Sequence, residues 1–496
     1  MRTRLLYRDR DVRALPALPE NADDLIRDLD LDALVAVMAD DARHRDVVRR
    51  IMLVGADDVD DIVHRQDVLR DCIATPDAVA EIHGIAQDAL DRERRTFLGI
   101  LSKASPARQM YHSVGVLKLY TAALADLRDC CIRHEGQFRS AGLRSLCSRM
   151  ATEFDESYVK SVEGYLDSLR FPKGESISAR LGTANHGTDY HLRRNRRPPV
   201  RDYVPLLEHS SLTFEIAPRD LAGAEALGEL CNHGNEAVAE ILAAAAEHVR
   251  GFFSALTIEL TFHLGCVRLC RALDSAGAPV SFPTARPATA RGFSFIQLVD
   301  PTLAVRRGDR PVGNDVDGFD GDVVFVTGAN QGGKTTFLRS VGLAQVMLRA
   351  GMFVAGDDYE APAHSGVFTH FRRPADATMR HGGFDDELER MSAVVDLIRP
   401  GALVLCNESF STTNFREGAA IGAAVVRALR DGGVTVVYVT HMFDLVDAFA
   451  ADPGDTLFLR AERRPDGART FRVCPEPASE TSHAEDVFRR IFGVAP

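Results

Sequence analysis

Apolar residues recur at steps of three and four positions from residue 20 to about residue 170 of the chain. Leu25, Leu29 and the apolar positions that follow them form a pattern typical of amphipathic helices. Glycine and proline are sparse in this stretch, which favours long helices. The helical pattern returns over residues 219–275. Between these regions, residues 175–217 alternate and carry turn residues, so they predict short strands and a loop.

Strand and helix patterns alternate after residue 292. In chain order these segments are VVFVTG, KTTFLRSVGLAQVMLRAG, ALVLCNES, EGAAIGAAVVRALRDGG and VTVVYVTH. Such alternation is typical of a largely parallel sheet. We therefore predict the α/β fold class, with a mostly helical region over residues 1–285 that includes the β-rich insertion near 175–217. An α/β domain is predicted over residues 286–496.

The composition, with 45% hydrophobic and 26% charged residues, is typical of a soluble globular protein. Because the net charge is −12, any contact with nucleic acid must come from a local basic patch. The N-terminal letters MRTRLLYRDRDVRALP place charges where a secretion signal needs an apolar core. No stretch of about 18 apolar residues is free of charges, and the nine cysteines form no CxxC pair. We expect a cytoplasmic protein with reduced thiols and no membrane span.

A glycine-rich motif carries the clearest chemistry. Residues 328–335, GANQGGKT, match G-x-x-x-x-G-K-[ST] in full, between an apolar strand and an amphipathic helix. Glycines let backbone N–H groups turn onto phosphate oxygens, and the helix directs its positive dipole end at the same oxygens. The motif therefore predicts a P-loop that binds ATP and Mg²⁺. Its expected contacts are Gly328, Asn330, Gly332, Gly333, Lys334, Thr335 and Thr336, with the Thr335 hydroxyl on the metal.

A second predicted strand ends in polar residues suited to hydrolysis. In P-loop ATPases this strand end carries an aspartate for the metal and then a glutamate that activates water. Glu408 fits the role of general base, whereas Asn407 brings an amide oxygen and no charge, which predicts weaker Mg²⁺ binding. His441 ends the next strand, where it can hydrogen-bond the γ-phosphate or the water. The alternative is that Glu408 and His441 are ordinary structural residues.

Taken together, these residues resemble the MutS family of DNA-repair ATPases. The similarity is closest over residues 327–356, and residues 408–418 and 440–445 resemble two later loops of the family. Val312–Asp315 resembles the segment over the nucleotide base, and residues 480–483 resemble a late T-S-[YH] segment. The resemblance implies an ABC-type ATPase domain that couples ATP binding and hydrolysis to a DNA clamp, and a homodimer. The run FFSALTIELTFHLGCVRLCRALDSAG resembles the lever helix that feeds into that domain.

The chain also departs from the family pattern. Gly382 stands where the family has a signature serine that approaches the γ-phosphate of the other subunit. The aromatic residue that stacks on adenine falls near Pro311. The mismatch-reading domain of the family has no counterpart ahead of the helices. The resemblance therefore implies a MutS-like protein without that domain, which binds duplex, mismatched or branched DNA.

The densest basic cluster is Arg193, Arg194, Arg196 and Arg197, in the predicted loop. Such a loop can reach a phosphate backbone and would bind DNA without reading its sequence. A solvated surface loop is the alternative interpretation.

We expect a MutS-like ATPase that acts in DNA repair, either in mismatch repair or linked to recombination. Asn407 and Gly382 motivate an alternative, a nucleotide-binding regulatory or scaffold protein with weak or no turnover. A third interpretation is an ATPase that acts on a substrate other than DNA.

Overall fold

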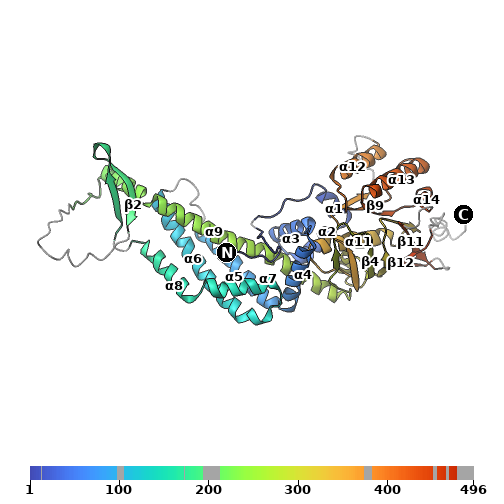
Figure 1. Cartoon of the computed structure of the whole chain (residues 1–496), viewed down its shortest axis with the longest axis horizontal. Helices are drawn as coiled ribbons and strands as arrows, with labels where there is room; N and C mark the ends of the chain where they lie inside the picture. Colours follow the sequence, from blue (N-terminus) through green and yellow to red (C-terminus); the bar gives the residue numbers. More distant parts are fainter. Residues whose placement is uncertain are drawn as a thin grey trace. The chain divides into compact units, whose positions relative to one another are not determined.

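A computed structural model describes most of the chain, and its residues group into two compact units (Figure 1). The described residues are 1–12, 14–97, 105–171, 174–193, 213–373, 382–450, 455–464 and 468–477. The first unit contains residues 1–3, 80–138 and 144–257, and the second contains residues 4–79, 139–143 and 258–496. The domain boundary near residue 285 stays a prediction, because the two units are grouped by contacts and each combines segments that are far apart in the sequence.

The first unit is built mainly from helices. It takes most of α5 (Pro76–Phe97), all of α6 (Pro106–His134), η1 (Glu135–Gln137), most of α7 (Ala141–Glu153), α8 (Glu156–Ser168), β1 (Ser176–Leu181), η2 (Thr183–Asn185), β2 (Gly187–Arg193) and the first part of α9 (Leu221–Ser275). The buried rings of Tyr120 on α6 and Phe253 on α9 stack with their centroids 5.3 Å apart. The antiparallel pair β1–β2 confirms the predicted short strands.

Buried charged side chains fasten the N-terminal segment to the second unit. The backbone N–H groups of Leu5 and Val12 donate to the two carboxylate oxygens of Glu259 on α9, at 2.9 and 3.2 Å. Arg65 is 1% exposed and donates from Nε to the carbonyl of Leu6 at 2.7 Å. These bonds satisfy charges that burial would otherwise penalise. The helices of this segment are α1 (Ala22–Asp28), α2 (Leu31–Met38), α3 (Ala42–Val54) and α4 (Val59–Ala74).

The larger sheet of the second unit is mostly parallel. Within the described residues its strand order is β12–β11–β6–β10–β9–β8. The parallel strands are β6 (Val323–Gly328), β8 (Val367–Phe371), β9 (Leu403–Asn407), β10 (Thr435–Val439) and β11 (Thr456–Arg463). At one edge β12 (Arg469–Pro475) runs antiparallel to β11. The predicted parallel sheet is therefore confirmed, and its near-continuous apolar strands are those of a sheet buried on both faces.

A smaller mixed sheet in the same unit was not predicted. Its order among the described residues is β3–β7–β4–β5. These strands are β3 (Thr284–Arg286), β4 (Phe293–Leu298), β5 (Asn314–Phe319) and β7 (Asp358–Pro362). They are short, and β3 pairs with β7 across more than 70 residues of sequence, as in the register of Thr284 with Glu360. A local pattern of apolar residues carries no signal of such distant pairing.

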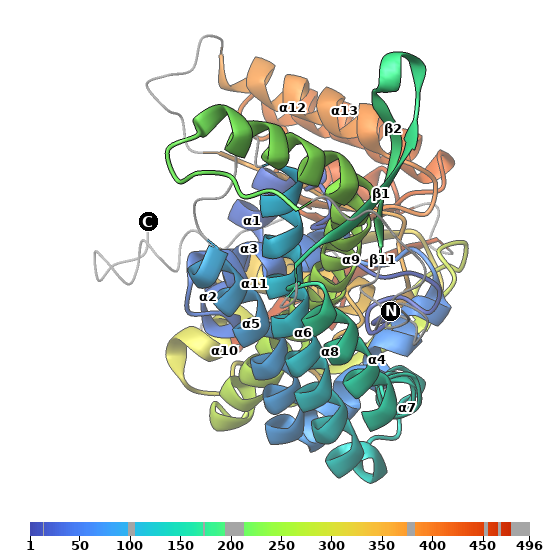
Figure 2. The same cartoon turned by 90° about the vertical axis from the view of Figure 1, so that its left-hand side faces the viewer.

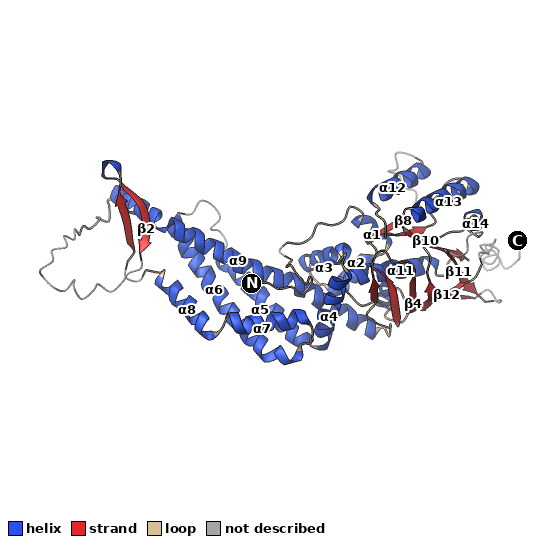
Figure 3. Ribbon diagram, viewed as in Figure 1, coloured by secondary structure: helices blue, strands red, loops and turns tan. Residues whose placement is uncertain are grey.

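Helices cover both faces of the larger sheet (Figure 3). On one face lies α11 (Lys334–Arg349), whose Gly342 leaves no room for a Cβ beside Leu405 of β9. On the other face α12 (Gly383–Leu397), α13 (Phe415–Asp431) and α14 (Phe443–Asp447) enclose an apolar core with β6, β9 and β10. Helices α12 and α13 lie side by side in two views (Figure 1, Figure 2). The short α10 (Pro301–Arg307) follows β4.

One described helix, α9, is long and apolar enough to cross a membrane by length and composition alone. Its most apolar window is 78% buried inside the protein. Packing within the chain therefore accounts for these apolar residues.

Gly351, just beyond α11, gives a test of this packing. Its φ is +73°, and a Cβ would lie 2.4 Å from the Cβ of Arg65. We predict that Gly351→Ala lowers the free energy of unfolding by about 2–4 kcal/mol, because it adds a steric clash to backbone strain. Gly308 is the matched control, since its φ is +68° and a Cβ added there would meet no atom within 4 Å. Gly308→Ala should cost only about 1 kcal/mol in urea denaturation. Equal losses for the two variants would contradict this packing.

Candidate functional site

The turn from β6 into α11 has the backbone geometry that its glycines predicted. Gly328 has φ +110° and Gly333 has φ +96°, in a region that L side chains rarely adopt. A Cβ on Gly332 would lie 2.9 Å from the carbonyl oxygen of Ala329. The side-chain oxygen of Gln331 accepts a hydrogen bond from Arg469 Nη1 at 2.7 Å, which ties the loop to β12. Glycine is therefore required at three positions of this loop.

Lys334 begins α11 and is 5% exposed. Its Nζ donates to the carbonyl oxygens of Gly328 and Ala329, each at 2.9 Å. Burial lowers the pKa of Lys334 to about 8, an effect that the nearby Glu408 carboxylate opposes and that Arg469 reinforces. The ammonium group therefore folds back onto its own loop, in a place where an anion would favour its charged form.

The parallel register of β9 and β10 brings the other predicted residues together at the carboxyl ends of these two strands. Asn407 lies opposite Val439, and the N–H of Glu408 donates to the carbonyl of Val439 at 2.9 Å. The hydroxyl of Thr335 donates to the amide oxygen of Asn407 at 3.4 Å. His441 follows β10, with its Nε2 lying 3.4 Å from Glu408 Oε1. The structure therefore gathers Thr335, Asn407, Glu408 and His441 around Lys334.

The environment of Glu408 favours its ionised form. Arg372 Nη1 lies 3.8 Å from Glu408 Oε2, on the side away from the histidine contact. The neighbouring His441 contributes most to lowering the pKa of Glu408, and Lys334 and Arg372 add to the effect against the opposing burial. The contact with His441 lacks the alignment of a full hydrogen bond, so we attribute its effect on the pKa of Glu408 to the closeness of the imidazole. An ionised carboxylate here can accept a proton from water.

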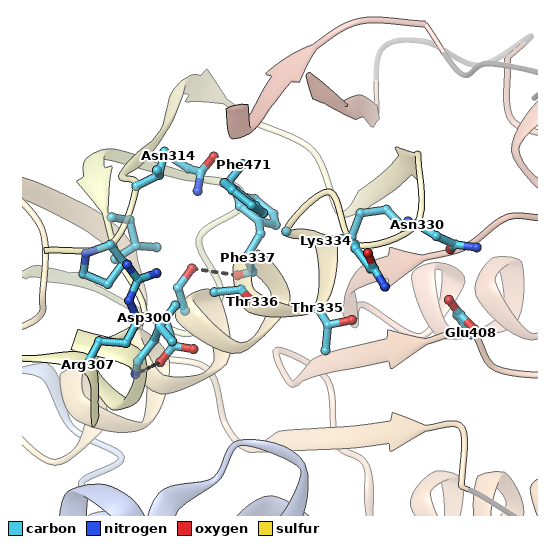
Figure 4. Close-up of a pocket in the computed structure, with 17 residues that line it drawn as sticks. Asp300, Arg307, Asn314, Asn330, Lys334, Thr335, Thr336, Phe337, Glu408 and Phe471 are labelled. Atoms are coloured by element: carbon cyan, nitrogen blue, oxygen red, sulfur yellow. Dashed lines mark hydrogen bonds between the residues drawn. The ribbon is translucent and has the colours of Figure 1, made fainter. Parts of the chain in front are cut away.

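A cavity of about 310 Å³ opens beside the loop (Figure 4). Its size is at the lower end of the range for small-molecule sites, roughly 300–1,000 Å³. Asn330, Gln331, Gly333, Lys334, Thr335, Thr336, Phe337, Ser340 and Glu408 line it on the loop side. Leu298, Asp300, Leu303, Arg307, Pro311, Val312, Asn314 and Phe471 line the rest. Two of the predicted contacts, Gly328 and Gly332, shape the loop without lining the cavity, and Pro311 and Val312 lie in its wall.

Sequence reasoning missed Phe471. This residue of β12 has φ +62°, is 50% exposed and points into the cavity wall (Figure 4). The buried amide oxygen of Asn314 holds its strand by accepting from the N–H of Val473 at 2.7 Å. Phe471 stands more than 130 residues after the P-loop and outside any motif, so only the pairing of β12 with the sheet reveals it. Its ring gives the cavity an aromatic surface.

Asp300 was also not predicted. Its carboxylate is buried, caps α10 by accepting from the N–H groups of Thr302 and Leu303, and accepts from Arg339 Nε at 2.6 Å. Arg339 stands one turn after the P-loop on α11. This pair fixes α10 against α11 and leaves Asp300 neutralised, so it shapes the cavity wall and adds little free negative charge.

The oxygen donors present suit a magnesium ion that is held weakly by the protein. The hydroxyl of Thr335 and the amide oxygen of Asn407 are both hard ligands of the kind Mg²⁺ accepts. Neither carries a charge, and Glu408 is already engaged by His441 and Arg372. These residues fit a metal ion whose remaining ligands are phosphate oxygens and water.

The predicted DNA-binding cluster is described only in part. Arg193 ends β2 in the first unit, and its Nε donates to the hydroxyl of Ser178 at 2.7 Å. Arg194, Arg196 and Arg197 lie outside the described residues, as do residues 480–483.

Gly382 precedes α12, where an added Cβ would meet no atom within 4 Å, so a larger side chain would fit there.

Comparisons with known proteins match both parts of the chain. The family model "MutS2 N-terminal domain" matches residues 57–276, and "MutS domain V" matches residues 324–464, which include the P-loop, Glu408 and His441. The DNA mismatch repair protein MutS of Thermus thermophilus is 30% identical over 165 residues, covering 33% of this chain and 20% of the relative.

Two further relatives show the same extent of similarity. MutS of Chloroflexus aurantiacus is 29% identical over 215 residues, 40% of this chain and 22% of the relative. The endonuclease MutS2 of Carboxydothermus hydrogenoformans is 32% identical over 154 residues, 31% of this chain and 19% of the relative. The matched part therefore spans about a fifth of the length of these curated relatives.

Proposed function

We propose that this chain, which belongs to the MutS family, binds ATP with Mg²⁺ beside the P-loop and couples ATP hydrolysis to DNA binding. The observation that carries the proposal is the convergence of Lys334, Thr335 and Glu408 on one cavity. In that arrangement the backbone N–H groups of the loop and the Lys334 ammonium bind the phosphates. The aromatic face of Phe471 and the ring of Pro311 flank the base.

Hydrolysis in this proposal depends on Glu408. Its carboxylate is ionised and lines the cavity, so it accepts a proton from the attacking water. His441 lies 3.4 Å from the carboxylate and favours its ionised form. Thr335 and Asn407 would hold a Mg²⁺ ion, which would supply positive charge to the phosphates.

The DNA part of the proposal rests on the family. The relatives are named for DNA mismatch repair or as endonucleases, and the family model "MutS domain V" matches residues 324–464 of this chain. We extend to it a role in DNA repair, cytoplasmic localisation and a homodimer. The basic cluster from Arg193 to Arg197 is the proposed contact with the phosphate backbone.

A second function is favoured by two particular residues. Asn407 removes the metal-binding charge, and Gly382 removes the signature hydroxyl. A regulatory protein that binds ATP and hydrolyses it slowly would keep the cavity and lose little by these changes. Turnover measured with and without DNA separates the two functions, because stimulation by duplex, mismatched or branched DNA supports the clamp. Turnover that DNA leaves unchanged would indicate a different substrate.

The P-loop and the general base have separable effects. We predict that Lys334→Ala weakens ATP binding at least about 100-fold, because it removes the buried charge that faces the phosphates. Glu408→Gln should keep ATP affinity within a few fold and lower turnover by about 100-fold or more, because it removes the base. Calorimetry and phosphate release measure the two effects. Lys160→Ala, at an exposed ion pair with Glu156, is the control. A Lys334→Ala variant that binds ATP like the wild type would refute the site.

The lowered pKa of Lys334 predicts proton uptake on binding. In the protein without nucleotide its pKa is about 8, so roughly half of the side chains are neutral at pH 8. Phosphate oxygens favour the ammonium and raise this pKa, so binding should take up about half a proton at pH 8 and almost none at pH 6.5. Affinity should then fall as the pH rises above 8. Calorimetry in buffers of different ionisation heat measures this uptake, and heats independent of the buffer at pH 8 would contradict it.

A further inference from the structure

Among the described residues, two basic side chains (Arg307 and Lys334) and two acidic ones (Asp300 and Glu408) line the cavity, and three arginines lie next to it. Glu408 is the carboxylate at the loop side, since Asp300 is neutralised by Arg339. Lys334 faces it, Arg469 reaches the loop through Gln331, and Arg372 lies against Glu408. Side chains thus already supply much of the positive charge that a triphosphate requires.

Arg372 lies at the carboxyl end of a parallel strand, where folds of this kind bind their ligands. It directly follows β8, and its N–H donates to the carbonyl of Asn407 at 2.9 Å. The carboxyl ends of β8 and β9 therefore lie together, on the edge of the sheet where ligands bind in folds of this kind. The Arg372 side chain lies next to the cavity lining and is half exposed, so it has space on the solvent side to turn toward the cavity while its backbone stays fixed.

Its ion pair with Glu408 is weak. The atoms are 3.8 Å apart, beyond a hydrogen bond, and the Arg372 side chain keeps 50% of its exposure. An exposed ion pair of this kind contributes about 1 kcal/mol or less to stability. A doubly charged phosphate group can therefore replace Glu408 as the partner of Arg372. A guanidinium also remains charged at all working pH values and can bind phosphate through two parallel N–H groups.

Asn407 explains why an additional positively charged side chain would be useful at this site. With an amide in place of a carboxylate beside Thr335, the protein gives a divalent ion no charged ligand there. Charge that develops on the terminal phosphate must then be balanced by another cation. An arginine supplied by the same chain can take that part.

We propose that Arg372 binds the γ-phosphate of ATP from within the same chain and takes over part of the role of the metal ion. This inference rests on the proposed function. Without nucleotide, Arg372 pairs with Glu408. With ATP bound, its guanidinium turns to the terminal phosphate and releases Glu408 to act on water. The site therefore distinguishes ATP from ADP through Arg372 and depends only modestly on Mg²⁺.

The test compares binding of ATP and ADP by calorimetry, with Mg²⁺ and with EDTA, to the full-length wild type and to variants. Wild type should prefer ATP in both conditions. Arg372→Ala should weaken ATP binding by about 10- to 100-fold and change ADP binding less than about twofold, and Arg372→Lys should fall between. Arg416→Ala, on an exposed position of α13 outside the cavity, should leave both affinities unchanged.

Each outcome decides the matter. A loss in Arg372→Ala that is equal for ATP and ADP, or no loss at all, would overturn the inference and leave ATP binding intact. A wild type that prefers ATP only when Mg²⁺ is present would also overturn it. If wild type binds neither nucleotide, the proposed function fails together with the inference. Thermal denaturation shows whether each variant is folded, and Arg372→Lys keeps the test valid if the alanine variant is not.

Discussion

The sharp turn from β6 into the buried helix α11 is the constraint on which the rest of the second unit depends. Three glycines allow the turn, and Lys334 folds back onto it through two carbonyl contacts. The helix that follows is buried along nearly its whole length against the sheet and α3. Because interiors are packed as densely as crystals, neither the loop nor the helix can shift without its neighbours. The packing of α11 therefore restricts how the loop can move.

The far end of α11 is joined to the N-terminal segment and to α9. The carbonyl of Ala350 accepts from Arg65, and Arg65 also donates to Leu6. The adjacent residue, Leu5, donates to Glu259 on α9. These contacts all lie within the second unit and form a continuous path from the end of α11 to Glu259 on α9. This connection gives the proposed coupling a physical basis.

Local patterns predicted the features that depend on neighbouring residues. The P-loop, the alternation of strands and helices, and the placing of Glu408 and His441 at strand ends all follow from short stretches of sequence. The cavity wall opposite the loop could not be predicted in this way. Phe471 and Asp300 reach the cavity wall, and Arg372 reaches Glu408, only because strands and helices far apart in the chain pair with one another. The MutS resemblance stated from motifs is confirmed by the family models, whereas the ATPase and DNA activities remain proposals.

Hydrogen exchange of the loop amides is the most direct test of ATP binding by this loop. We expect the N–H groups of residues 329–335 to bind the phosphates of ATP. Exchange measured by mass spectrometry should slow in this segment when ATP and Mg²⁺ are added, while the hairpin β1–β2 of the first unit serves as the internal reference. Unchanged exchange over residues 329–335 at millimolar ATP would contradict ATP binding by this loop.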